Sequence, residues 1–425
     1  MIPIDEQPYP LPDGWQWVTI KDIADVKGGK RLPKGKNLVD YKTRYPYIRV
    51  TDFFDNTIKA DELKYLEEDV YNSIKRYTIS SKDVYISIAG SIGKVGTIPL
   101  DLDGANLTEN AAKITRLRGV NQSFLMWFLT SDFAQGQIKD LTKSTTQPKL
   151  ALFRIEKIPI PLPPLDEQQR IVALLDELFT DLDEAKTLAQ AVVDGSKLRR
   201  AAILHKAFTG ELSWLWRDEH DTTLDGWQRT FWGKCGTFIA GSAFKKDFQG
   251  LQDYETPFYK VGSLKFADDG GYLFDESDTI NEDIRKELKA KLIPTNSLLF
   301  AKIGEAIRLN RRALNRVPCC IDNNMMAFIP EKILLRYAFH WSRSVNLYEY
   351  ANATTVPAIR KSDLEKIPVP LPPLEEQKEI VRLLDDLLGR DQRTTALALK
   401  TIERVELMKK SILARAFRGE LGTNK

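Results

Sequence analysis

The sequence of 425 residues contains few of the side chains that catalytic and metal-binding sites use. It has three cysteines and three histidines, at Cys235, Cys319, Cys320, His205, His220 and His340. The cysteine spacing fits neither a disulfide framework nor a zinc site, so we expect reduced, mostly buried thiols in a cytoplasmic protein. No histidine has a partner at nucleophile or metal spacing, which favours structural roles.

Long apolar runs and a strong net charge are also missing. No run of eighteen apolar residues occurs, and the first residues have neither the basic start nor the apolar core of a signal peptide, so we expect no membrane span. The net charge of +3 neither requires nor excludes nucleic acid. Residues 90–95 (GSIGKV) lack the spacing and the hydroxyl of a phosphate loop. Hydrophobic residues at 43% are enough for globular cores.

What the chain does contain is a stretch written twice. Residues 156–178 read EKIPIPLPPLDEQQRIVALLDEL, and residues 365–387 read EKIPVPLPPLEEQKEIVRLLDDL. The same offset of 209 aligns AFTGEL at 207–212 with AFRGEL at 416–421. Because no insertion separates the copies over this length, the pattern indicates a domain-scale duplication.

Each copy has the same local pattern. The proline-rich runs 159–164 and 368–373 predict stiff extended arms. Asp166 followed by Gln169 resembles a capping box that starts a helix, and Gly210 falls where the C-terminal cap belongs. Apolar residues then recur at alternating spacings of four and three, as in the seam of a coiled coil. The seam and partner-contact candidates are Ile171, Leu175, Leu178, Leu182, Val192, Ile203, Ile380, Leu384, Leu387, Val405, Met408 and Ile412, with Ala185 and Ala189 between them.

In the second copy, Asp391, Thr394 and Thr401 interrupt the seam. Two helices of about 40 residues, or roughly 60 Å each, can still bury their seams against each other. A hairpin that merely holds two domains together is the simpler alternative. Two similar domains held apart by rigid helices would instead recognise two DNA half-sites at a fixed spacing, as a molecular ruler does, since a duplex repeats every ~34–36 Å.

The segments between the arms also repeat, with an offset that drifts from 209 to 214. Short β-branched or aromatic runs at 47–50 and 84–88 predict strands, and residues 124–138 and 333–350 predict helices. The fold class we expect is α+β: two globular α+β domains separated by two long antiparallel coiled-coil helices, with an internal two-fold repeat. The predicted boundaries are 1–154 for the first domain, 155–212 for its arm and helix, 213–363 for the second domain and 364–425 for its arm and helix.

Basic loops recur at matching places in both globular segments. Such loops suit phosphate contacts, and arginine suits guanine edges in a major groove. Lys94 follows the Gly90–Gly93 turn, and an offset of 214 places it on Arg308. A solvated loop is the alternative at any single cluster. The DNA-binding candidates are Lys30, Arg31, Lys34, Lys36, Ser91, Lys94, Thr145, Thr146, Lys245, Lys246, Arg308, Arg311, Arg312, Thr354 and Thr355.

These motifs give the chain a close resemblance to the specificity subunit of type I restriction–modification systems. The resemblance covers nearly the whole chain, and its most specific parts are PLPPLxEQxxI at 161–171 and 370–380, the AFxGEL ends and the TTxP motif before each arm. It implies two target recognition domains, at 13 to about 150 and 225 to about 360. Each would read one half of a bipartite, asymmetric DNA site, and the helices would set the spacer.

The resemblance also implies partners and places the chemistry in them. Double-stranded DNA, two methyltransferase (modification) subunits and two restriction (translocase and nuclease) subunits would join this chain. Adenine methylation and ATP-dependent cleavage, with S-adenosylmethionine, ATP and Mg²⁺, would belong to those partners, and this chain would have no catalytic residue, metal or cofactor. Two alternatives remain open: a non-catalytic protein-binding scaffold without specific DNA recognition, and a self-contained nuclease, which would need a carboxylate cluster that the sequence does not show.

Overall fold

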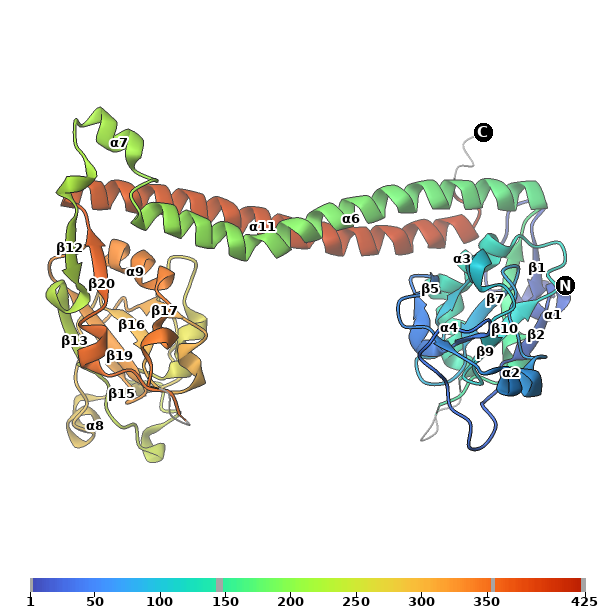
Figure 1. The fold of residues 1–425 in the computed structure, drawn as a ribbon, viewed down its shortest axis with the longest axis horizontal. Helices are drawn as coiled ribbons and strands as arrows, with labels where there is room; N and C mark the ends of the chain where they lie inside the picture. Colours follow the sequence, from blue (N-terminus) through green and yellow to red (C-terminus); the bar gives the residue numbers. More distant parts are fainter. Residues whose placement is uncertain (1–2, 143–147, 353–355, 422–425) are drawn as a thin grey trace. The chain divides into compact units, whose positions relative to one another are not determined.

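The structure, a computed structural model, describes residues 3–142, 148–352 and 356–421. The chain divides into two units. Unit 1 comprises Met1–Gln190 with Leu399–Lys425, and unit 2 comprises Ala191–Ala398. Two helices of 44 residues, α6 (Leu165–Phe208) and α11 (Leu374–Phe417), contribute to both units. The α+β fold class with two long paired helices and an internal repeat is therefore confirmed (Figure 1).

In unit 1 the main sheet has the order β2-β10-β7-β8, a second sheet has the order β6-β3-β9, and two pairs β1-β11 and β4-β5 complete the strands. The strands are β1 (Gln16–Thr19), β2 (Asp25–Gly28), β3 (Pro46–Ile48), β4 (Phe53–Phe54), β5 (Thr57–Ile58), β6 (Lys64–Tyr65), β7 (Val84–Ser87), β8 (Val95–Gly96), β9 (Asn106–Leu107), β10 (Ala111–Thr115) and β11 (Pro159–Leu162). The shorter helices are α1 (Ile20–Ile23), α2 (Glu68–Ile74), α3 (Gln122–Thr130), α4 (Asp132–Leu141) and α5 (Leu152–Ile155).

Unit 2 repeats three of these four sheets, with the orders β13-β19-β16-β17, β15-β14-β18 and β12-β20. The strands are β12 (Gln228–Phe231), β13 (Gly236–Ala240), β14 (Thr256–Tyr259), β15 (Thr279–Ile280), β16 (Leu298–Ala301), β17 (Arg312–Leu314), β18 (Cys320–Ile321), β19 (Met325–Pro330) and β20 (Pro368–Leu371). The shorter helices are α7 (Trp214–Glu219), α8 (Glu282–Glu287), α9 (Leu335–Ser344) and α10 (Lys361–Leu364). These three strand orders match those of unit 1, so the duplication extends through the globular segments, although the pair β4-β5 has no counterpart among the described residues of unit 2.

The proline arms are extended, as predicted, and they are also strands. β11 pairs antiparallel with β1, and β20 pairs in the same way with β12. Each pair therefore joins the start of a globular segment to the start of the long helix that follows it. Proline is tolerated there because each pair has only two strands, so every strand keeps one edge free of ladder hydrogen bonds.

The start of the first long helix differs from the prediction. The helix begins at Leu165, because the carbonyl of Pro164 already accepts the amide hydrogen of Gln168. Asp166 therefore lies in the first turn, where its negative charge interacts favourably with the helix dipole. The predicted Asp166–Gln169 capping box was wrong. The predicted C-terminal glycine is confirmed: Gly210 has φ of +86° and Gly419 has φ of +73°, the left-handed conformation of a C-cap.

Two predicted helices are interrupted. The segment 124–138 divides into α3 and α4 at Ser131, whose extended backbone and hydroxyl cap the second helix. The segment 333–350 contains α9 and, after a break, a 3₁₀ turn at Leu347–Tyr350. All three cysteines are buried and unpaired, and burial raises the pKa of Cys320 to about 11, so their packing agrees with the expectation of mostly buried thiols.

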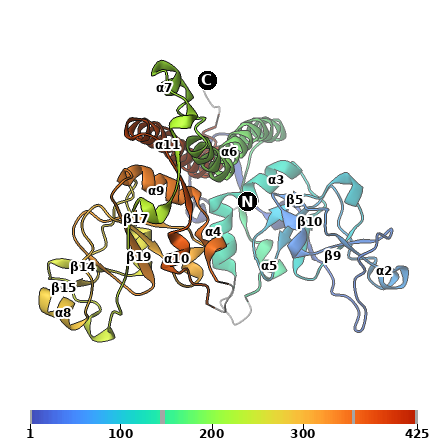
Figure 2. The same ribbon diagram turned by 60° about the vertical axis from the view of Figure 1, so that its left-hand side comes forward.

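The cores of both units include the first turns of the long helices. In unit 1, Ile171 and Leu175 are buried with the apolar side of α3, and in unit 2, Ile380 and Leu384 are buried with that of α9. Figures 1 and 2 show α9 lying beside α11 in unit 2. Each globular segment is thus packed directly onto the helix that follows it, not tethered by a loop alone.

Candidate nucleic-acid interface

The first group of candidates lies on equivalent loops of the two units. Lys30, Arg31, Lys34 and Lys36 lie on the connection from β2 to β3, and Lys245 and Lys246 lie on the connection from β13 to β14. All six side chains are exposed. The sequence reasoning therefore matched two loops that the topology also matches.

Several of these cations already have acidic neighbours. Arg31 pairs with Glu109 at 2.7 Å, Lys36 with Asp69 at 2.5 Å and Lys245 with Glu287 at 2.8 Å. Exposed ion pairs of this kind contribute at most about 1 kcal/mol, so a phosphate oxygen can replace the carboxylate at little cost. The arrangement suits reversible contacts with a nucleic-acid backbone.

The second group lies on two equivalent hairpins, β7–β8 and β16–β17. Ser91 and Lys94 are exposed on the first, and Arg308 and Arg311 are exposed on the second. Arg308 pairs with Glu305 at 2.8 Å and lies 3.9 Å from the ring centre of Tyr348.

The strand register corrects the sequence-based match between these hairpins. Ile86 pairs with Val95, and its counterpart Phe300 pairs with Arg312. Lys94, which precedes Val95, therefore corresponds to Arg311 and not to Arg308. The two hairpins differ in length, so a constant offset of 214 could not identify the equivalent residue.

Arg312 differs from the other basic candidates because it is buried. Its side chain lies in strand β17 and the residue is only 6% exposed. Its guanidinium donates to neutral acceptors, among them Asn310 Oδ1 at 2.8 Å and the carbonyl of Ser342 at 3.0 Å. Burial, together with the nearby Arg343 cation, lowers the pKa of Arg312 to about 9.

The four threonine candidates, Thr145, Thr146, Thr354 and Thr355, lie outside the described residues. The residues that follow them are described. Lys149 forms a β-bridge with Ala89, and Ala358 forms one with Ile303. Each TTxP motif is therefore followed by a segment that pairs just beyond β7 or β16, at the start of the basic hairpin.

The seam candidates divide by burial. The buried ones are Ile171, Leu175, Ile380, Leu384 and Val405, and the partly buried ones are Leu178, Leu182, Val192, Ile203, Leu387 and Ile412. Met408 exposes 51% of its surface, so its side chain does not lie in the seam as predicted. Leu413, Ala416 and Phe417 are buried instead and pack into the core of unit 1.

Polar contacts join the two long helices within each unit. In unit 1, Lys186 pairs with Glu406 at 2.6 Å. In unit 2, Asp391 accepts hydrogen bonds from Ser196 at 2.9 Å, Arg199 at 2.8 Å and Arg200 at 3.0 Å. The residue that interrupts the apolar seam is therefore a buried carboxylate held by three donors.

Sequence reasoning missed a pair of equivalent glutamines. Gln168 accepts a hydrogen bond from the amide of Asn121 and donates to the carbonyl of Pro163, and Gln377 makes the same contacts with Leu334 and Pro372. Both residues are almost fully buried. They tie the start of each long helix to the N-terminus of α3 or α9. Their invariant place in PLPPLxEQ was the available signal.

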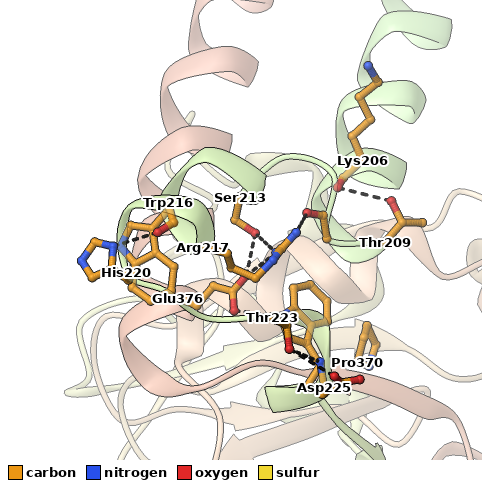
Figure 3. A network of polar contacts seen from close by, with 12 residues as sticks. Lys206, Thr209, Ser213, Trp216, Arg217, His220, Thr223, Asp225, Pro370 and Glu376 are labelled. Atoms are coloured by element: carbon orange, nitrogen blue, oxygen red, sulfur yellow. Dashed lines mark hydrogen bonds and ion pairs between the residues drawn. The ribbon is translucent and has the colours of Figure 1, made fainter.

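A network confined to unit 2 was also missed (Figure 3). Glu376 accepts hydrogen bonds from Arg217 at 2.6 Å, Ser213 at 2.8 Å and Trp227 at 2.8 Å. Arg217, on α7, also donates to the carbonyl of Gly210. This buried ion pair joins the end of α6 to the start of α11.

The model of the type I restriction modification DNA specificity domain matches residues 12–191 and 225–406. The chain belongs to this family. It is a DNA-specificity subunit of a type I restriction–modification system, and this subunit of such systems is non-catalytic. Family membership decides against the scaffold and nuclease alternatives.

Individual relatives resemble the chain over nearly its whole length. It is 23% identical to the StySPI specificity subunit of Salmonella potsdam, covering 97% of this chain and 90% of the relative. It is 26% identical to the putative MjaX specificity subunit of Methanocaldococcus jannaschii, covering 97% and 94%. The specificity-subunit structure from Thermoanaerobacter tengcongensis superimposes with a TM-score of 0.64 at 21% identity, over 98% of this chain and 100% of that one.

A second solved structure, described as showing complex assembly and conformational transition of the type I system, gives a TM-score of 0.72 at 21% identity, over 97% of this chain and 100% of that one. These likenesses support the fold. Among the described residues, no group of three or more His, Cys, Asp or Glu side chains could hold a metal ion. No helix in the described part of the specificity subunit is both long and apolar enough to cross a membrane.

Proposed function

We propose that each globular segment of this specificity subunit reads one half of a bipartite, asymmetric DNA site. The observation that carries the proposal is that the two units share a topology but present different side chains at equivalent positions. Three sheets have the same strand order in both units, and basic loops follow equivalent strands. Yet Lys94 corresponds to Arg311, and the loop residues differ. Equivalent surfaces with different donors suit two half-sites of different sequence.

In this proposal the recognition domains are residues 1–154 and 213–363, and the arms with their helices are 155–212 and 364–425. The exposed candidates on the four basic loops and hairpins contact DNA: Lys30, Arg31, Lys34, Lys36, Ser91, Lys94, Lys245, Lys246, Arg308 and Arg311. The threonines of the two TTxP motifs remain candidates.

The long helices set the spacer between the half-sites. Each contributes residues to both units, and 44 residues of α-helix measure about 66 Å at about 1.5 Å per residue. That length exceeds one turn of duplex DNA, about 34–36 Å, so two recognition domains can bind the same groove at sites one or more turns apart.

The helices also dock two methyltransferase subunits. Large apolar side chains are exposed at positions related by the repeat: Leu198 is 76% exposed and its counterpart Leu407 is 66% exposed. Leu188 and Leu397 form a second such pair, at 63% and 64%. Leu188 and Leu407 lie in unit 1, whereas Leu198 and Leu397 lie in unit 2. Matching apolar surface in each unit suits two copies of one partner.

The chemistry belongs to the partners in this proposal. The methyltransferase subunits methylate adenine with S-adenosylmethionine, and two restriction subunits add ATP- and Mg²⁺-dependent translocation and cleavage. This chain supplies position and sequence choice.

The test is a genome-wide map of methylated adenines in cells that carry this chain and its methyltransferase. We expect a two-part motif that disappears when only this chain is deleted. Replacing residues 13–150 with the same segment of a relative should then change one half of the motif and leave the other. A change in both halves, or a motif that persists without the chain, would contradict the proposal.

A further inference from the structure

Unit 2 contains a groove with a strong excess of positive charge. Its volume is about 800 Å³, and it is lined by α9, the adjoining parts of α6 and α11, and the loops at 264–271 and 309–312. Seven of the lining side chains are arginine or lysine, and three are aspartate. This balance would repel a cation and attract an anion.

The aspartates leave most of these cations unneutralised, because Arg336 is the lining cation that Asp385 pairs with and Asp268 pairs with an arginine outside the groove. Asp385 pairs with Arg336 at 2.6 Å and contacts His340 at 2.8 Å, and Asp268 pairs with Arg316 at 2.8 Å. Arg343 and Arg393 line the same groove, their side chains are exposed, and neither has an ion pair within the described residues. Their donors are available to a ligand.

Arg312 is a second, independent sign that the groove suits an anion. It lines the groove, is 6% exposed and contacts neutral acceptors, and its Nε has no hydrogen-bond partner among the described residues. Buried charges in proteins are normally paired, because an unpaired charge loses its hydration without compensation. The neighbouring Arg343 makes this worse by repulsion. An anion in the groove would relieve both.

The charge is specific to unit 2 and does not come with the fold. Asn121 and Leu334 make the same hydrogen bond to their glutamines, which aligns Arg343 with Thr130. The strand register aligns Arg312 with Val95. Thr130 and Val95 both line the corresponding groove of unit 1, which has a volume of about 370 Å³ and, among the residues that the structure describes, is lined by one basic side chain, Lys94. The topology needs neither arginine.

We propose that the arginine groove of unit 2 binds backbone phosphates of the bound DNA, next to the half-site that this unit reads, without reading bases. This inference rests on the proposed function. Guanidinium groups match phosphate oxygens in pairs. DNA is favoured over a free nucleotide by position: Arg311 lies on the basic β16–β17 hairpin, and Arg393 lies on the helix assigned to the spacer.

The experiment uses the assembled complex of the full chain with its methyltransferase subunits. The test variant is R343Q/R393Q. The matched control is R382Q/R390Q, which removes two charges from α11 at exposed residues whose ion pairs, within the described part of the chain, are with Glu379 and Asp386 of the same helix. DNA affinity is measured by fluorescence anisotropy over a salt series, on a duplex carrying the mapped motif and on a duplex with both half-sites scrambled.

We expect the test variant to lose affinity for both duplexes by similar factors. The slope of log K against log[salt] should fall in magnitude by about 1–2, because each phosphate contact contributes about 0.9. The methylated motif should stay the same. If the test variant has the same salt slope and affinity as the control variant, the assignment is wrong. It is also wrong if the test variant alters the methylated motif, because the groove would then contact bases.

Two further measurements separate other ligands. If R343Q/R393Q prevents assembly with the methyltransferase, the groove is a protein contact and the proposal is wrong. If it abolishes binding of pyrophosphate or ATP while DNA affinity is unchanged, the groove is a free-phosphate site and the DNA assignment is wrong. A wild-type complex that binds both duplexes equally would refute the proposed function itself, whereas wild-type discrimination with an unaffected variant refutes only the groove.

Discussion

The buried pair Arg217–Glu376 offers a sharp test of how unit 2 is held together. The side chains are 9% and 2% exposed, and Glu376 also accepts hydrogen bonds from Ser213 and Trp227. Replacing Glu376 with glutamine removes the negative charge and leaves the Arg217 cation buried. Breaking one partner of a buried pair costs about 3–5 kcal/mol.

The repeat supplies a matched control. Glu167 is the counterpart of Glu376 at the offset of 209, but its side chain is 24% exposed and pairs with Arg170 three residues along the same helix. Such a pair contributes about 0.2–0.5 kcal/mol. The same chemical change, glutamate to glutamine, should therefore have unequal effects at two positions with the same local sequence.

Hydrogen exchange measured by mass spectrometry on the full chain reports the difference locally. At about 1.4 kcal/mol per factor of ten, E376Q should speed exchange in peptides covering α7 and the start of α11 by about 100-fold or more. E167Q should speed exchange at the start of α6 by about twofold. A second variant, R217M/E376M, should recover most of the protection, because it leaves no unpaired charge. Equal effects of E376Q and E167Q would refute the reasoning.

Three other predictions concern the long helices. Inserting about one heptad after Val192 should lengthen the spacer of the methylated motif or abolish methylation, and an unchanged motif with normal activity would contradict the ruler. Burial opposes ionisation of Asp391, but hydrogen bonds from Arg199, Ser196 and Arg200 outweigh it, so the pKa of Asp391 is lowered below 3.8. The charged carboxylate therefore stabilises the fold above pH 3.8, and this contribution is lost as the pH falls through the folded-state pKa. In acid titrations, the difference in free energy of unfolding between wild type and D391N should disappear over the same pH range. L198D/L407D should lower the number of methyltransferase subunits bound per chain, measured by native mass spectrometry, without unfolding it; two bound subunits would exclude these leucines from the interface.

Some of the candidate site followed from sequence and some did not. The basic loops at 30–36 and 245–246 were found because flexible loops keep their cations exposed whatever the packing. The burial of Arg312 could not be predicted because its neighbour Arg311 looks the same in sequence, and only the pleat of β17 decides that successive side chains point to opposite faces. Met408 was misplaced because apolar periodicity cannot distinguish a seam from a surface that a partner would cover.

The duplicated architecture was determined by the sequence alone. A constant offset from 156–212 to 365–421 repeats the same extended arm, helix and glycine cap, because these depend on residues close together in the chain. Tertiary structure alone decided the surroundings of equivalent residues. Glu376 is buried and Glu167 is not, since the partners of Glu376 come from α7 and Trp227. The arginine groove likewise joins side chains from distant segments, so no local pattern could reveal its unpaired charge.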